Sequence, residues 1–140
     1  MVNPIIDNGA LWRRGSFQQI YSEALTALAQ LHGYSHDLLG SCNEGADFST
    51  VQANFNLADQ YYKEAKQNAN HLSLWHAAKV EGKPVSGWTQ REIEQNALLR
   101  SLEKMISSAM DNLLLVYRIW LAKEQFAHPA PKGEDDVGAP

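Results

Sequence analysis

The most restrictive feature of this sequence is a four-three spacing of mostly apolar residues that recurs in three long stretches without proline. This spacing places the repeated residues at positions a and d of a heptad, on one face of an α-helix. The three seams are Phe17, Tyr21, Ala24, Leu28, Leu31, Ser35 and Leu38; then Val51, Phe55, Ala58, Tyr62, Ala65, Ala69, Leu72 and His76; then Leu99, Leu102, Ile106, Ala109, Leu113, Val116 and Trp120. No stretch sustains the two-residue alternation of a strand, so the sequence predicts an all-α protein.

Glycine and proline separate the three stretches. The sequence predicts helices over about 17–39, 49–80 and 89–127, linked by the glycine-bounded segments 40–45 and 82–87. The second helix is polar and asparagine-rich near its middle, where a kink or break is plausible.

Capping residues support these boundaries. Ser16 is a suitable N-cap for the first helix. Thr89 and Glu92 have the spacing of a capping box, in which hydroxyl and carboxylate each accept a free backbone N–H at the helix start. The third helix is expected to stop at His128, because Pro129 follows it.

Short links between amphipathic helices favour antiparallel neighbours. We therefore expect an elongated up-down-up bundle of three helices with coiled-coil-like seams. The expected organisation is a loose N-terminal arm over 1–15, a helical bundle domain over 16–128 and a disordered, acidic tail over 129–140.

Composition narrows the classes of partner. The 140 residues suit one domain, and the net charge is −4, with 12 Lys and Arg against 16 Asp and Glu. The only compact basic cluster, Arg13 and Arg14 beside Trp12, would neutralise few phosphates, so we expect no nucleic-acid partner.

Targeting signals are also missing from the sequence. No apolar stretch approaches the roughly 20 residues that span a bilayer, so we expect no membrane span. The N-terminus lacks the pattern of an ordinary signal peptide, and the lone Cys42 suits a reducing compartment. We expect a cytoplasmic protein, although export without a signal peptide stays open.

Few residues could carry chemistry. His32 and His36 are four apart on one helix and could share a metal ion, with His71 or Asp37 as a third ligand. The alternative for these histidines is partial exposure without any ligand. Cys42 would need a neighbouring base to act as a nucleophile. No glycine-rich phosphate-binding motif occurs, and we expect neither a cofactor nor an active site.

The third helix has more apolar residues than its seam requires. Leu114, Leu115 and Leu121 lie at positions b or c, and Tyr117 and Ile119 flank the seam. Aromatic side chains at position g of the second helix, Tyr61 and Trp75, add area of a kind enriched at interfaces. Either the other helices and the N-terminal arm bury these residues, or another protein chain does.

We therefore expect a non-enzymatic helical module for protein–protein interaction: an adaptor, a chaperone-like protein or an assembly subunit. It would act through the apolar surface of its last helix, as a homo-oligomer or on a partner helix. The predicted contact residues are Leu114, Leu115, Tyr117, Ile119, Leu121, Tyr61 and Trp75. The alternative is a metal- or cofactor-binding helical bundle that uses His32, His36 and His71.

Overall fold

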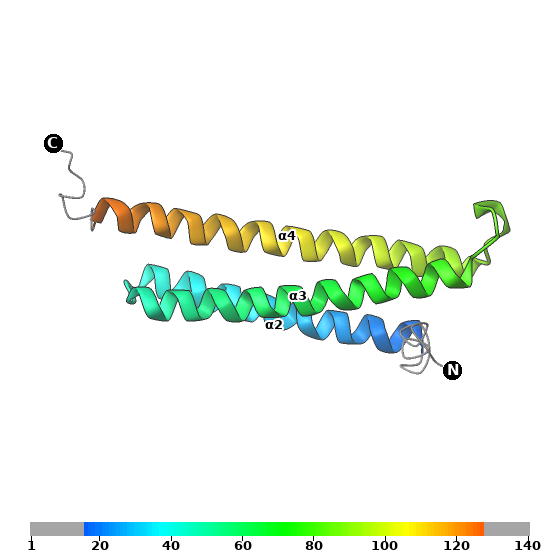
Figure 1. The fold of residues 1–140 in the computed structure, drawn as a ribbon, viewed down its shortest axis with the longest axis horizontal. Helices are drawn as coiled ribbons and strands as arrows, with labels where there is room; N and C mark the ends of the chain where they lie inside the picture. Colours follow the sequence, from blue (N-terminus) through cyan, green and yellow to red (C-terminus); the bar gives the residue numbers. More distant parts are fainter. Residues whose placement is uncertain (1–15, 128–140) are drawn as a thin grey trace, which may run out of the picture.

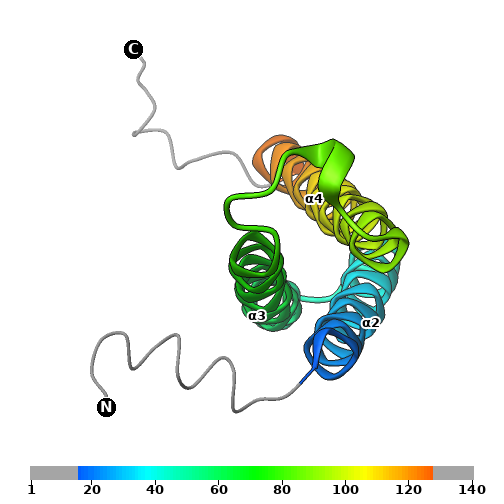
Figure 2. The same ribbon diagram turned by 90° about the vertical axis from the view of Figure 1, so that its right-hand side faces the viewer.

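A computed structural model describes residues 16–127 as three long helices lying side by side (Figure 1). Helix α2 spans Phe17–Asn43, α3 spans Phe48–Lys79 and α4 spans Gln90–Ala127. A short 3₁₀ turn, η1, covers Val85–Gly87 in the link between α3 and α4. Viewed along its length, the bundle places each helix against both others (Figure 2).

The predicted all-α, three-helix bundle is confirmed, and the described part of the chain contains no strand. The helices run up, down and up, so α2 and α4 point the same way and α3 runs against both. The predicted arm (1–15), the tail (129–140) and the Arg13–Arg14 pair lie outside the described residues.

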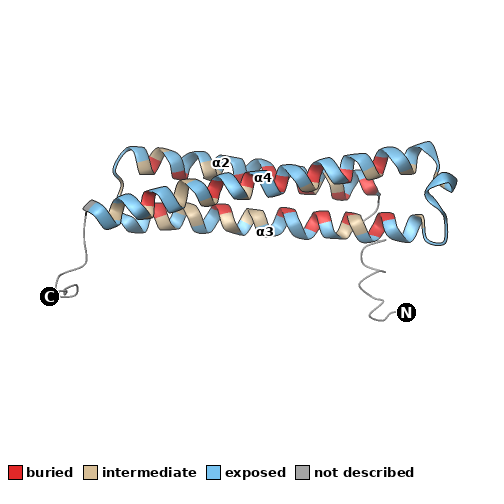
Figure 3. Cartoon of the chain, turned by 90° about the horizontal axis from the view of Figure 1, so that it is seen from above, coloured by how far each residue is buried: buried red, intermediate tan, exposed pale blue. Residues whose placement is uncertain are grey.

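The three heptad seams form the core, as a buried stripe along the inner side of each helix (Figure 3). Leu31, Leu72 and Leu102 are each fully buried, one from each helix. Seam residues Phe55, Tyr62 and Val116 are partly buried and pack against this core. The a and d spacing therefore identified most of the core. On α2 the buried face is turned toward position g, because Ile20 and Ala27 are buried there whereas the seam residues Tyr21 and Ser35 are only partly buried.

Helices α2 and α3 make the closest pair in the bundle. Their shared interface is lined by small buried residues, which let two helix backbones approach. The buried alanines are Ala24 and Ala27 on α2 and Ala58, Ala65 and Ala69 on α3, of which Ala69 also lines a groove between α3 and α4. The inward face of α4 carries Leu, Ile and Trp instead, so α4 contacts the other two less extensively.

The end of α2 differs from the prediction, because the helix continues through Gly40 to Asn43. Ser41 explains the extra turn: its side chain is buried, donates to the Leu38 carbonyl at 2.9 Å and accepts from Asn54 of α3 at 3.3 Å. The chain reverses only at Gly45, whose φ of 74° is a left-handed conformation that glycine adopts readily.

Helix α3 begins at Phe48 because Asp47 caps it. The Asp47 carboxylate accepts the Thr50 backbone N–H at 2.9 Å. The helix is continuous to Lys79, so no break occurs in its asparagine-rich middle. Asn68 is buried there and donates to the Glu64 carbonyl at 3.2 Å, between the seam residues Ala65 and Ala69. Close packing against α2 thus offsets the low helix propensity of this segment.

Candidate interaction surface

The two flanks of α4 differ in chemistry. On the flank turned toward α3, Tyr117 stacks on Phe55 with ring centroids 4.1 Å apart, and its hydroxyl donates to the Gln52 side chain. Tyr117 and Leu121 are half-buried and pack against the core. Aromatic stacking and a hydrogen bond therefore close this part of the flank within the monomer. Farther toward the start of α4, a groove of about 270 Å³ lies between Lys66 of α3 and Glu103 of α4.

Charged side chains occupy the rim of the same flank. Lys63 pairs with Asp59 at 3.0 Å on α3, and Arg100 pairs with Glu103 at 3.0 Å on α4. Such exposed pairs contribute little to stability, but they keep the α3–α4 flank hydrated and polar.

The flank of α4 turned toward α2 is apolar and open. Leu39 of α2 lines a groove of about 180 Å³ with Val116, Ile119 and Trp120 of α4. Leu25 lies two heptads before Leu39 and therefore on the same side of α2. Leu98 and Met105 lie three and two heptads before Ile119 and therefore on the same side of α4. The exposed fractions are Leu25 37%, Leu39 44%, Leu98 43%, Met105 38%, Leu115 57% and Ile119 48%.

We call this surface the α2–α4 face. Its members are all exposed, and none is Asp, Glu, Lys or Arg. By heptad position they are Gln18, Leu25, His32 and Leu39 on α2, and Leu98, Ser101, Met105, Ser108, Asn112, Leu115, Ile119 and Ala122 on α4. Charged residues bound the face at its two ends, with Arg91 and Glu94 at one and Lys123 at the other.

Apolar residues on the face form two clusters separated by a polar centre. The near cluster is Leu25, Leu98 and Met105, close to the start of α2. The far cluster is Leu39, Leu115 and Ile119, close to the end of α2. Because α2 and α4 run in the same direction, His32, Ser108 and Asn112 fall between the two clusters.

The structure places the contact residues predicted from the sequence on different surfaces of the bundle. Leu115 and Ile119 lie on the α2–α4 face. Leu114, Tyr117 and Leu121 are half-buried on the other side of α4. Tyr61 is half-buried and stacks on Tyr34 with centroids 5.6 Å apart.

Trp75 requires a correction, because it is only 7% exposed and therefore presents almost no surface. Its ring lies edge-on to Phe17 of α2, with ring centroids 5.8 Å apart. Position g of α3 points into the close α2–α3 interface, so Trp75 belongs to the core.

Sequence reasoning missed four of the six large apolar residues of the face: Leu25, Leu39, Leu98 and Met105. A signal was present, because these residues recur at seven-residue multiples beside their seams. Whether such residues are buried or exposed depends on which flank of each helix the bundle leaves open, and heptad spacing does not specify that flank.

The candidate metal ligands are not brought together. His32 and His36 are exposed on α2, whereas His71 lines a groove between α2 and α3 with Glu23 and Thr26, more than a helical turn away along α2. Among residues 16–127, no group of three or more His, Cys, Asp or Glu is arranged to hold a metal ion. The metal-binding alternative therefore has no ligand set within the described bundle.

Cys42 lies at the far end of the face, half-buried beside Leu39 and Trp120. Burial raises the pKa of its thiol above the ordinary value, and the positive charge of Lys123 offsets this only in part. No histidine or carboxylate lines the groove beside it. Its surroundings favour the thiol over the reactive thiolate.

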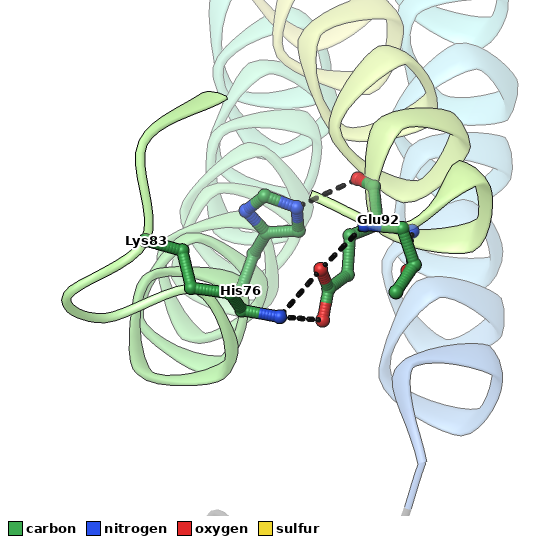
Figure 4. Close-up of polar contacts among 4 residues, drawn as sticks. His76, Lys83 and Glu92 are labelled. Carbon is green, nitrogen blue, oxygen red and sulfur yellow. Dashed lines mark hydrogen bonds and ion pairs between the residues drawn. The ribbon is translucent and has the colours of Figure 1, made fainter. Parts of the chain in front are cut away.

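The most connected polar cluster joins the end of α3 to the start of α4 (Figure 4). Thr89 and Glu92 form the predicted capping box, with hydrogen bonds of 2.9 and 3.1 Å. Lys83 pairs with the Glu92 carboxylate at 2.9 Å, and Nε2 of the buried His76 donates to the Glu92 carbonyl at 2.8 Å. These contacts fix the reversal between the two helices, which is a structural role.

Acidification is expected to weaken this junction. The hydrogen bond from Lys83, followed by that from the Thr89 backbone, lowers the pKa of Glu92 below its ordinary 4.5. Because the folded-state pKa is the lower one, the contribution to stability is present above about pH 4.5 and is lost as the pH falls through the folded pKa. Urea unfolding of wild type and Glu92→Gln should therefore differ at pH 7 and converge in acid.

Lys83→Met serves as the matched variant, because it removes the main cause of the pKa shift while leaving Thr89 and Glu92 in place. It should reproduce part of the loss at pH 7. A difference between wild type and Glu92→Gln that stays constant from pH 7 into acid would contradict this account.

Comparison with known proteins found no match: no family model, no curated protein and no solved structure matches this chain. Within residues 16–127, none of the helices is long and apolar enough to cross a membrane.

Proposed function

We propose that this protein is a non-enzymatic helical interaction module and that its α2–α4 face is the surface that binds another protein. The observation that carries the proposal is the contrast between the two flanks of α4. The flank toward α3 is covered in part by Tyr117 and carries ion pairs. The flank toward α2 exposes apolar side chains, and Lys123 lines its groove only at the far end.

The size of the face supports this role. From their exposed fractions, the six large apolar side chains present roughly 500 Å² to solvent in total, divided about equally between two clusters that a polar centre separates. Depletion of charge at the centre of a patch is the compositional mark of protein interfaces.

The proposed class is that of an adaptor or assembly subunit, and we place it in the cytoplasm on the compositional grounds given above. Binding would use a preformed, rigid surface, because both helices that carry the face are held by the same core. A rigid surface avoids much of the entropy that a flexible segment loses on association.

Photo-crosslinking in the cells that naturally produce this protein tests the proposal. A benzoyl-phenylalanine at Ser108, in the centre of the face, should give a protein adduct. The same group at Gln67, exposed on α3 away from the face, should not. Ile119→Glu should deplete the Ser108 adduct, whereas Leu74→Glu should spare it, because Leu74 is 58% exposed on α3 outside the face. Equal adducts at both positions, or none at Ser108, would contradict the proposal.

A further inference from the structure

We infer that the α2–α4 face binds a second copy of this chain, with the two copies antiparallel about a two-fold axis. The α2 and α4 helices of both copies would then form a central four-helix bundle. This inference rests on the proposed function and specifies its partner.

Charge is the first reason. In a two-fold dimer the same patch meets itself, so any charge concentrated on the patch opposes its own copy. The face limits this repulsion, because its heptad lines carry no Asp, Glu, Lys or Arg between Leu98 and Ala122 on α4 or between Gln18 and Leu39 on α2. Lys123 lines the groove only at its far end. A surface selected for a charged partner helix would carry complementary charges, and these lines carry none.

Area and length are the second reason. A stable dimer buries about 800 Å² from each partner, and the six large apolar side chains supply roughly 500 Å² of this. The interspersed Ala, Ser, Asn and Gln side chains are exposed and add to this area. From Leu98 to Ile119 the face runs about 32 Å, and a second copy presents a surface of the same length.

Side-chain size allows the copies to approach closely. Ser101, Ser108 and Ala122 on α4 are small and exposed along the length of the face. Small residues at these positions permit helix axes to pack at about 8–10 Å, with the leucines of one copy between the helices of the other.

Helix direction selects the antiparallel arrangement. Because α2 and α4 point the same way, a parallel dimer would align four helix dipoles side by side. An antiparallel dimer pairs two helices up with two down, as in ordinary four-helix bundles. It also places the near cluster on the far cluster of the partner, and it brings His32, Ser108 and Asn112 together at the axis.

The first experiment measures the mass of the full-length protein by analytical ultracentrifugation over a wide concentration range. We expect a monomer–dimer equilibrium. Ile119→Glu or Met105→Glu should weaken it by about a hundredfold or more, because each buries an unpaired charge. Leu74→Glu adds the same charge outside the face and should leave the dimer unchanged, and circular dichroism verifies that all three variants fold.

The second experiment tests direction with a short bismaleimide. In the antiparallel dimer, the two copies of Ser108 lie near the axis, while the two copies of Cys42 lie at opposite ends. Ser108→Cys in a Cys42→Ser background should therefore crosslink efficiently, and the wild-type protein, with Cys42 alone, should not. Efficient crosslinking through Cys42 with none at position 108 would overturn the antiparallel arrangement.

A wild-type protein that is monomeric at every concentration would overturn the inference, and so would a dimer that neither Ile119→Glu nor Met105→Glu weakens. These results separate the inference from the proposed function. A monomer whose Ser108 adduct contains a different protein, lost in Ile119→Glu, retains the interaction function with another partner. A monomer that gives no such adduct removes both.

Discussion

Replacing Leu102 with alanine is expected to lower the free energy of unfolding by about 2–5 kcal/mol. Leu102 is fully buried on α4, where it faces the seams of both other helices. The truncation removes favourable burial and leaves a cavity that three long, rigid helices cannot collapse to fill. Urea unfolding followed by circular dichroism at 222 nm measures the change.

Leu74→Ala is the matched control, because it makes the same truncation at a side chain that is 58% exposed. It should change the free energy of unfolding by no more than about 0.5 kcal/mol. Equal losses for the two variants would show that Leu102 is not in the core. Because dimer formation would couple stability to protein concentration, the comparison should be made at one low concentration.

Enlarging Ala65 to leucine is the second change with a large expected effect. Ala65 is fully buried on α3, the helix that packs most extensively against α2. Added methylene groups must displace α2 or adopt strained rotamers, and overpacking of this kind costs about 1–3 kcal/mol and occasionally more. The expected result is a lower urea midpoint despite the greater apolar content of the side chain.

Ala53→Leu provides the comparison within the same helix. Ala53 is exposed on α3, and leucine and alanine have similar helix propensities. This variant should change the free energy of unfolding by less than about 0.5 kcal/mol. If Ala65→Leu proved as stable as Ala53→Leu, the close α2–α3 packing described above would be wrong.

These two residues show why the core could be predicted from the sequence. Leu102 and Ala65 both lie at position d of their heptads, and helix geometry alone brings such positions to one face. The end of α2 was harder to place, because Ser41 joins the helix only through contacts with Leu38 and with Asn54 of the next helix. Local residue preference around Gly40 indicates a turn, and tertiary contacts override it.

The candidate surface was predictable only in part. Leu115 and Ile119 were identified because they are apolar residues that lie outside the a and d positions of the seam. Trp75 was misplaced, because a residue at position g is exposed in an isolated coiled coil but buried where two alanine-lined helices pack closely.

The sequence by itself determined that this chain forms three amphipathic helices, about where each begins, and most of the residues that turn inward, because these properties follow from local capping and from the period of the helix. Tertiary structure alone decided which side of α4 is closed and which is open. Small residues draw α2 and α3 together, Tyr117 and Phe55 close the α3 side of α4, and Leu39 and Ile119 are left at the surface. That outcome depends on relative side-chain volumes across three helices, which no single periodic pattern contains.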